Sequence, residues 1–207
     1  MKTSDLFQKE IEYIVNPVIQ NIVREMLDTV PKYFQTIPAS SSGKYHPEYA
    51  QGKGGLVRHT KAAVGIAKSM IDTDIFKHLM FEFKSVREEV VCTFKDSAYA
   101  ALILHDSCKG DDTERHQTRF DHPLLAANTF KEIARKYITD DNVEYMKIII
   151  PLIFKGISTH MGQWSTAPYA KGVILPEPQT NFELFVHMCD YLASRKCLEY
   201  QFFDTEE

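Results

Sequence analysis

The segment Ser97–Leu104 reads Ser-Ala-Tyr-Ala-Ala-Leu-Ile-Leu and runs directly into His105-Asp106. Small or apolar side chains occupy nearly every position, so a helix formed here would present no polar face to solvent. A helix that is apolar all round belongs in the interior of a fold. The segment therefore predicts a central buried helix that ends in a histidine and an aspartate.

The sequence on both sides of this segment shows helical periodicity with start and stop signals. Asn16-Pro17 and the Thr180-x-x-Glu183 capping box are typical helix starts, Asp121 is the expected cap of another helix, and Pro31 is a stop. We expect a short helix around Ile11–Val15, a second after Asn16 and a third from Gly55 to about Asp72. A fourth should begin at Asp121, with Leu124 and Leu125 packing inward, and a fifth should span 142–158, bent or restarted at Pro151. The inner face of the last helix should carry Phe182, Val186, Cys189, Ala193 and Cys197.

The remaining sequence argues against strands and against a second domain. Segments 38–55 and 162–179 are rich in Gly, Pro and Ser and are expected to be loops. There is no internal repeat, no low-complexity tract and no interdomain linker. We therefore expect an all-α fold, a single-domain helical bundle over 1–207, in which N-terminal helices within 1–44 pack on a motif-bearing core within 45–196.

The composition is that of a globular protein, with 207 residues, 44% hydrophobic and 25% charged. This excludes a disordered chain, a collagen-like repeat and a disulfide miniprotein. The net charge of −4 argues against long duplex nucleic acid but leaves a small anionic substrate open. The four cysteines form no C-x-x-C pair, so we expect free thiols rather than a zinc knuckle. No signal peptide or membrane span is expected, and a cytoplasmic location fits.

Six titratable residues lie on apolar helix faces or at the ends of apolar helices, where burying a polar group is costly. A single histidine such as His59 is more often a hydrogen-bonded core residue than a ligand. Asp106 and Asp190 are harder to explain, because a carboxylate among apolar residues needs a cation or several donors. Imidazole and carboxylate without thiolate suit Mn, Fe, Co, Ni or Zn. We expect one or two such divalent ions at His59, His105, Asp106, His122, His160 and Asp190.

Several short motifs occur in a fixed order along the chain. They are Gly54-Gly55-Leu56-Val57-Arg58-His59-Thr60, Leu104-His105-Asp106-Ser107-Cys108-Lys109, Ile157-Ser158-Thr159-His160-Met161-Gly162, Pro176-Glu177-Pro178 and His187-Met188-Cys189-Asp190-Tyr191-Leu192-Ala193. In this order the chain resembles the HD superfamily of metal-dependent phosphohydrolases, and within it the HD domain of the YhaM-type 3′-5′ exoribonucleases. Two positions depart from that pattern: Cys108 stands where glycine is usual, and His160 is a single histidine where a pair is usual. No strand-rich segment like the OB domain of those exonucleases precedes the motifs.

The resemblance implies a role for each matched residue. His59, His105, Asp106 and Asp190 would hold one metal ion. Asp106 would bridge to a second ion held by His122 and His160. Asp106 and Lys109 would be the catalytic residues, with the lysine close to the phosphate. A metal-activated hydroxide would attack phosphorus. Apart from the resemblance, Lys53, Arg58 and Trp164 are candidate substrate residues: Lys53 or Arg58 could add positive charge, and Trp164 could stack on a base.

The leading hypothesis is a metal-dependent phosphohydrolase, with manganese as one suitable ion, that acts on nucleotides or short oligonucleotides. Hydrolysis of phosphate esters is favoured over hydrolysis of anhydrides. The alternatives are a 3′-5′ exonuclease or cyclic-dinucleotide phosphodiesterase and, from another class, a non-catalytic nucleotide-sensing HD module, which the Cys108 substitution supports. A purely structural helical protein would leave two inward aspartates unexplained.

Other polar residues leave their interpretation open at this point. His46 either reaches the site or is an ordinary loop histidine, and Gly52-Lys53-Gly54-Gly55 either presents amides to a phosphate or is a flexible helix entry. For Trp164, stacking on a base and packing within the fold are equally good interpretations. We expect His78, His116 and His187 to be structural or surface residues, and 111–115 to form a solvated turn.

Overall fold

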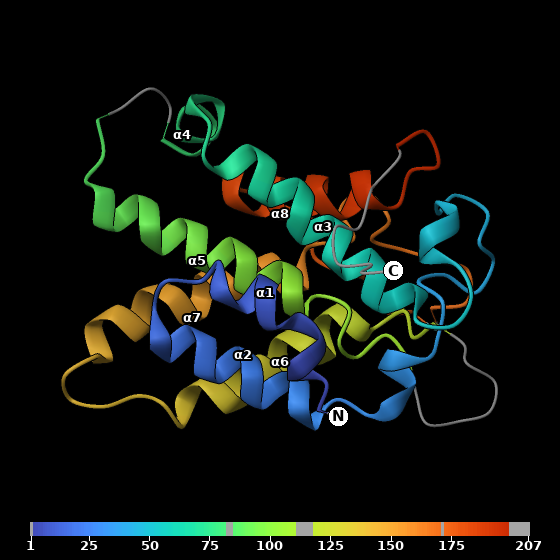
Figure 1. Ribbon diagram of the computed structural model, residues 1–207, viewed down its shortest axis with the longest axis horizontal. Coiled ribbons are helices and arrows are strands. Elements are labelled where there is room, and N and C mark those ends of the chain that lie inside the picture. The colour runs from blue at the N-terminus through green and yellow to red at the C-terminus, as the bar shows by residue number, and fades with distance from the viewer. Residues whose placement is uncertain (1, 82–84, 111–117, 171, 199–207) are drawn as a thin grey trace.

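The fold is known from a computed structural model that describes residues 2–81, 85–110, 118–170 and 172–198. Within these ranges the chain forms eight α-helices and three short 3-10 helices and no strand, so the prediction of an all-α fold is confirmed (Figure 1). The α-helices are α1 (Gln8–Glu12), α2 (Pro17–Thr29), α3 (Gly55–Ile71), α4 (Asp74–Phe81), α5 (Glu88–Leu104), α6 (His122–Arg135), α7 (Val143–Ser158) and α8 (Asn181–Ala193), and the 3-10 helices are η1 (Ser4–Phe7), η2 (Lys32–Gln35) and η3 (Glu48–Ala50). The expected turn at 111–115 and His116 lie outside the described residues.

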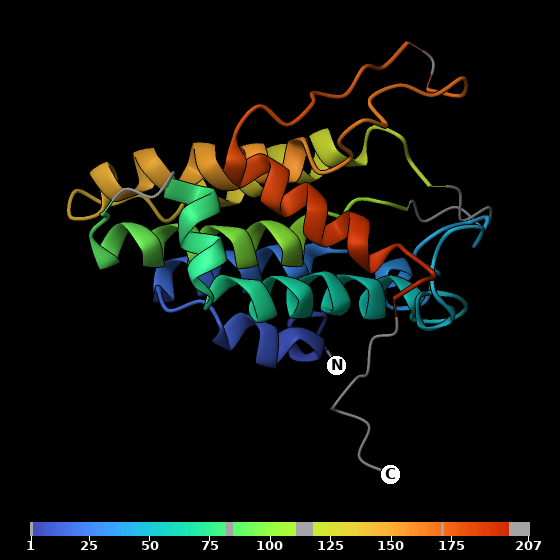
Figure 2. The same cartoon turned by 90° about the horizontal axis from the view of Figure 1, so that it is seen from above.

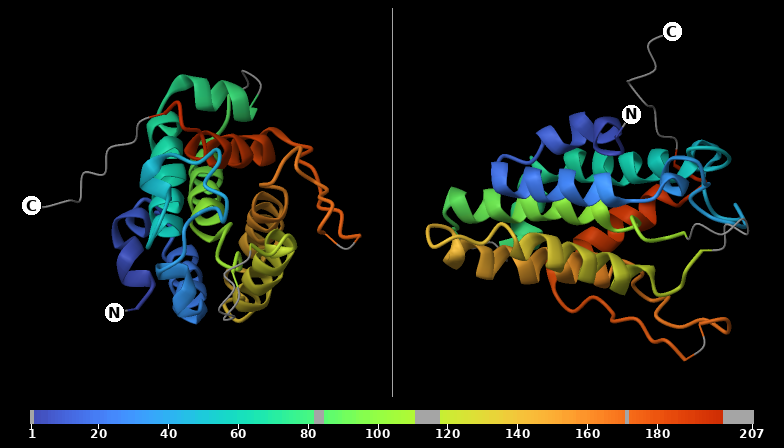
Figure 3. Two further views of the ribbon diagram at one scale, coloured as in Figure 1. Left: turned by 90° about the vertical axis from the view of Figure 1, so that its right-hand side faces the viewer. Right: turned by 90° about the horizontal axis from the view of Figure 1, so that it is seen from below.

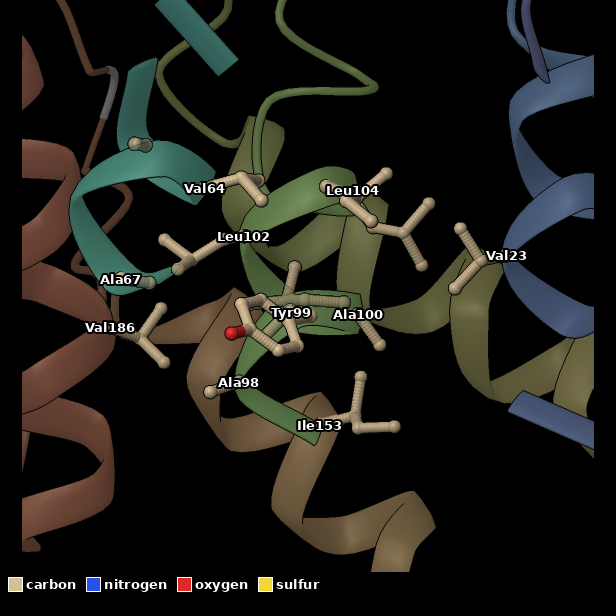
Figure 4. Packing of buried hydrophobic residues seen from close by; sticks show 14 of the residues in the cluster. Val23, Val64, Ala67, Ala98, Tyr99, Ala100, Leu102, Leu104, Ile153 and Val186 are labelled. Carbon is tan, nitrogen blue, oxygen red and sulfur yellow. The ribbon is translucent and has the colours of Figure 1, made fainter. Parts of the chain in front are cut away.

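Helix α5 is the centre of the bundle. It contacts α1, α2, α3, α7 and α8. Its residues 98–104 are all at most 2% exposed, as expected for a helix without a polar face. Figure 4 shows side chains from four neighbouring helices, Val23, Val64, Ile153 and Val186, directed toward this segment. The apolar run that ends in His105 therefore lies where the sequence predicted it.

The helix starts follow the predicted caps at two of three places. The Asn16 side chain accepts hydrogen bonds from the amides of Val18 and Ile19, and the Thr180 side chain accepts one from the amide of Glu183. The Glu183 carboxylate closes this second cap by accepting from the backbone amide at position 179. Asp121 occupies the N-cap position of α6 but makes no capping hydrogen bond. Its carboxylate pairs instead with the guanidinium of Arg119, so the predicted side-chain cap is wrong.

Other differences lie at the periphery of the bundle. Helix α4 was not predicted, because it is a short surface helix that buries only Phe76 and Met80. Helix α7 continues through Pro151 without a break. Cys197 lies beyond the end of α8 and is exposed, rather than on the inner face of that helix. Leu124 and Leu125 are only half-buried. No helix of the described part of the chain has the length and apolar character needed to cross a bilayer.

One end of the bundle collects the ends of five helices. The first turns of α3 and α6 and the last turns of α5, α7 and α8 all lie there, as Figure 2 shows along the helices and the left panel of Figure 3 shows end-on. Gly156 allows α7 to approach its neighbours closely, since a Cβ atom there would lie 3.0 Å from side-chain atoms of both Ala101 and Phe182. Residues far apart in the sequence are thereby brought together at this end.

Asp96 links the N-terminal helices to α5 and provides a test of the fold. Its carboxylate accepts hydrogen bonds from the amides of Val15 (2.9 Å) and Asn16 (2.8 Å). Replacing Asp96 with Ala leaves these amides without their acceptor and should lower the free energy of unfolding by about 1–3 kcal/mol. Burial raises the pKa of Asp96, so keeping it charged is costly, and Asp96→Asn should lose less than Asp96→Ala.

Urea denaturation followed by circular dichroism measures this difference. Glu132→Ala is the control, because its exposed carboxylate pairs only at the surface with Arg135 and its loss should cost less than about 0.5 kcal/mol. Equal losses for the Asp96→Ala and Glu132→Ala variants would contradict the linking role of Asp96.

Candidate metal centre

The six predicted ligand residues meet at this end of the bundle. The helices place them at or near their ends: His59 in α3, His105 and Asp106 directly after α5, His122 as the first residue of α6, His160 just beyond α7, and Asp190 in the last turn of α8. The four histidines and Asp106 are at most 1% exposed. The Asp190 side chain is 17% exposed and is the member of the cluster closest to solvent.

The first half of the cluster surrounds two carboxylate oxygens with two imidazoles. Oδ1 of Asp190 lies 2.8 Å from Nε2 of His59 and 3.4 Å from Nε2 of His105. Oδ2 of Asp106 lies 3.3 Å from Nε2 of His105 and 3.7 Å from Nε2 of His59. Two imidazole nitrogens and two carboxylate oxygens thus face one small volume.

The second half of the cluster uses the other oxygen of Asp106. Oδ1 lies 3.0 Å from Nε2 of His122 and 3.6 Å from Nε2 of His160. These two Nε2 atoms are 3.2 Å apart. Each oxygen of Asp106 therefore faces a different pair of imidazoles, which is the arrangement expected of a carboxylate that bridges two sites.

Backbone carbonyls determine which ring nitrogen faces the cluster. Three histidines direct Nδ1 at the carbonyl oxygen three residues earlier: His105 at Leu102 (2.6 Å), His122 at Arg119 (2.6 Å) and His160 at Ile157 (2.8 Å). A carbonyl can only accept, so Nδ1 carries the proton and donates it. In the neutral imidazole, Nε2 then has a free lone pair, as in most histidines that ligate metals.

The second half of the cluster brings two imidazole nitrogens and one carboxylate oxygen together. Burial lowers the pKa of His122 to about 4, despite the nearby Asp106 carboxylate, so this ring is neutral at pH 7. Its Nε2 lone pair faces Nε2 of His160 and Oδ1 of Asp106. Oδ1 of Asp106 completes no hydrogen bond, although it is buried. A buried acceptor of this kind is costly unless a cation satisfies it, and the nitrogen and oxygen ligands of the cluster fit a divalent transition metal.

The charges within the cluster are balanced by one lysine and one proton. Burial opposes ionisation of Asp106, but the Lys109 ammonium and the His105 imidazole hold the pKa of this carboxyl well below its usual range. Burial likewise opposes ionisation of Asp190, whose pKa is held well below its usual range by hydrogen bonds from His105 and His59. Burial works against a charged His105, yet the two carboxylates, Asp106 foremost, raise its pKa to about 10. A cation at the site would take over the role of that proton.

Lys109 lies at the cluster through an ion pair. Its Nζ atom is 2.6 Å from Oδ2 of Asp106, and its side chain is 12% exposed. The resemblance to the HD superfamily implies that this lysine lies close to the substrate phosphate. In the structure it neutralises Asp106 on the oxygen that faces His59 and His105.

The structure brings some of the predicted substrate residues to the site and leaves others away from it. Lys53 is exposed and no described contact directs it at the cluster. Arg58 donates hydrogen bonds to the backbone carbonyls of Tyr49 and Gln51, so it holds the loop before α3 rather than facing a substrate. Trp164 is 41% exposed, and its ring lies 6.0 Å from that of His187, which donates a hydrogen bond to the backbone oxygen of His160.

Two histidines near the cluster carried little or no signal in the sequence. The ring of His46 lies 5.3 Å from that of His59, and burial lowers the pKa of His46 to about 3, so it stays neutral. His187 is buried, and its Nδ1 donates to the backbone oxygen of His160 (2.6 Å). His187 lies three positions before Asp190, one helical turn away, and this spacing could have revealed it. His46 comes from a loop and had no such signal.

A cavity of about 400 Å³ lies on another side of the loop that follows Asp106. It is lined among others by Tyr33, Ser107, Cys108 and Thr129, and by none of the six cluster residues. The Tyr33 hydroxyl donates to the carbonyl of Ser107 (2.9 Å). The cavity is therefore a neighbour of the metal centre, separated from it by the residues that follow Asp106.

Comparison with protein-family models, with curated proteins and with solved structures returns no match.

Metal binding should displace the proton from His105. With a pKa of about 10 in the metal-free protein, His105 is protonated at pH 7.5, whereas a ligating imidazole must be neutral. Affinity for Mn²⁺ or Zn²⁺ should therefore rise with pH up to about 10, and binding at pH 7.5 should release on the order of one proton. Isothermal titration calorimetry in buffers with different ionisation enthalpies measures the release. A binding enthalpy that does not depend on the buffer would contradict this account.

Proposed function

We propose that the protein is a metal-dependent phosphohydrolase of the HD type that cleaves phosphate esters of nucleotides or short oligonucleotides. The observation that carries this proposal is the position of Asp106, whose two buried oxygens face two separate pairs of imidazoles. The motif order that resembles the HD superfamily supports the same function.

The residues for one or two ions are present. His59, His105, Asp106 and Asp190 would hold the first, and Asp106, His122 and His160 the second. When bound, such ions polarise phosphoryl oxygens and increase the acidity of water. Manganese, iron, cobalt, nickel and zinc all suit this set of nitrogen and oxygen ligands.

The charge of the occupied site favours an anionic substrate. Two divalent cations and the Lys109 ammonium would carry more charge than the Asp106 and Asp190 carboxylates can balance. A phosphate group can supply the missing negative charge, and the attraction is strong because the cluster lies away from bulk water.

The chain's own groups orient and hold protons at this site. The carbonyls of Leu102, Arg119 and Ile157 keep the proton of each partner histidine on Nδ1, which leaves Nε2 free on the side of the cluster. Lys109 stabilises Asp106 as the anion and, as the partly exposed member of that ion pair, is available to an incoming phosphate.

A covalent mechanism through the nearby cysteine has no support in the structure. Cys108 is only half-buried, yet burial raises the pKa of its thiol, which disfavours the nucleophilic thiolate. Its polar neighbours include the hydroxyls of Ser107 and Thr129, and neither is a general base. Water is therefore the proposed nucleophile.

Two other functions use the same cluster. Cleavage of the 3′ end of an oligonucleotide or of a cyclic dinucleotide would need the same ions, and the YhaM-like motif around His160 favours it. Labelled single-stranded RNA and DNA separate these possibilities: a ladder of shortened products indicates an exonuclease. Tight nucleotide binding with retained metal and no turnover at any tested ion would indicate a sensing module.

Asp106→Asn should remove both metal and activity. The amide cannot offer two anionic oxygens, so elemental analysis should show loss of bound metal, and phosphate release from a nucleotide panel with Mn²⁺ should fall by at least about a hundredfold. The thermal stabilisation that added metal gives the wild-type protein should disappear as well.

Asp72→Asn is the matched control. Asp72 is an exposed aspartate that also pairs with lysines, Lys68 and Lys95, but lies outside the cluster. It should keep metal and activity. Normal metal content in Asp106→Asn, or no hydrolysis by the wild-type protein of any nucleotide or oligonucleotide with any of these metals, would overturn the proposal.

A further inference from the structure

Three aromatic rings and one guanidinium gather beside the metal cluster. The Trp164 ring stacks on the Tyr191 ring, with centroids 5.6 Å apart and planes inclined by 17°. The guanidinium carbon of Arg195 lies 4.4 Å from the centroid of Tyr191, 5.5 Å from that of Tyr45 and 5.8 Å from that of Trp164. We call these four residues, Tyr45, Trp164, Tyr191 and Arg195, the aromatic rim.

Each ring of the rim is connected to a residue of the cluster. Tyr191 directly follows Asp190 on α8. Tyr45 precedes His46, whose ring contacts that of His59. Trp164 contacts His187, which in turn donates to the backbone oxygen of His160. The rim is therefore linked, through His46 and His187 and through the chain neighbour Asp190, to residues of both halves of the cluster.

The rim is open to solvent although it is rich in aromatic surface. Tyr45 is 55% exposed and Trp164 is 41% exposed. One exposed aromatic residue is ordinary on a protein surface, but here segments around positions 45, 164 and 191–195 contribute to one patch. A backbone hydrogen bond from Lys196 to Tyr45 (3.1 Å) holds two of these segments together.

The rim also carries a positive charge that no described carboxylate neutralises. Among the residues that the structure describes, the hydrogen bonds of the Arg195 guanidinium go to the hydroxyl of Ser194. Its other contacts are the three ring faces. A cation held against aromatic rings can receive an anion while the rings receive a flat, apolar group.

We infer that the aromatic rim binds the nucleobase of the substrate, so that the substrate class is nucleotides rather than sugar or polyol phosphates. The inference rests on the proposed function, because it assumes that the phosphate is held at the cluster. Stacking on aromatic side chains suits any base, since every base has a π-face. Arg195 adds attraction for a second phosphate or for the electron-rich edge of a base.

The tryptophan makes this inference testable without turnover. Trp164 is the only tryptophan of the chain, so intrinsic fluorescence excited at about 295 nm reports on the rim alone. Adenosine, guanosine, cytidine and uridine carry a base but no phosphate and cannot be hydrolysed at phosphorus. Nucleosides should quench the emission, whereas ribose should not. This readout stays informative even if the proposed hydrolysis fails.

Variants of the rim test its role in catalysis. Tyr45→Leu and Arg195→Gln should raise KM for nucleotides on the order of tenfold. They should change kcat for nucleotides by no more than about twofold, because the reacting phosphate would still be held at the cluster. Tyr169→Leu is the control, because Tyr169 is 69% exposed on the same loop as Trp164 but contacts Phe120 outside the rim.

Three results would overturn the inference. Equal effects of nucleosides and ribose on Trp164 emission would show that no base stacks there. Unchanged KM in Tyr45→Leu and Arg195→Gln, together with a lower melting temperature than that of Tyr169→Leu, would show a packing role only. A change in oligomeric state in the rim variants, with no quenching by nucleosides, would assign the rim to a protein partner.

Discussion

The structure depends on the burial of two carboxylates at the end of an apolar helical bundle. Asp106 is 1% exposed and follows α5, the central helix of the bundle, and Asp190 lies beside it. Isolated charges in such a place would be too costly to keep. Four imidazoles and one lysine therefore surround them. We propose that a divalent cation completes this balance of charge.

The helix ends both position the histidines of this site and provide hydrogen-bond acceptors for them. The last carbonyls of an α-helix have no partner within the helix. The carbonyls of Leu102 in α5 and Ile157 in α7 are such groups, and they accept the Nδ1 protons of His105 and His160. These hydrogen bonds thus give the free carbonyls a partner and also turn Nε2 of each histidine toward the cluster. Helices that end together at one side of a bundle are therefore well suited to build a histidine-rich centre.

Much of this arrangement could be predicted from the sequence, because local rules govern it. The apolar run before His105, the Asn16 and Thr180 caps and the six inward polar residues all follow from helical periodicity and the cost of burial. The roles that depend on loops could be predicted less well. Arg58 was expected to add positive charge for a substrate, but it bonds to loop carbonyls. The sequence left open whether His46 reaches the site, because its contact with His59 depends on the path of the loop before α3. The aromatic rim likewise joins three segments whose spacing in sequence carries no period.

The most direct test of the central claim is an anomalous diffraction measurement at the manganese edge on crystals of the protein grown with Mn²⁺. We expect at least one strong peak within bonding distance of a carboxylate oxygen of Asp106 and of Nε2 atoms of its neighbouring histidines. Lys109 should no longer pair with the Asp106 oxygen that binds the metal. A map without a peak at Asp106, with the Lys109–Asp106 ion pair intact and manganese only at surface carboxylates, would contradict it.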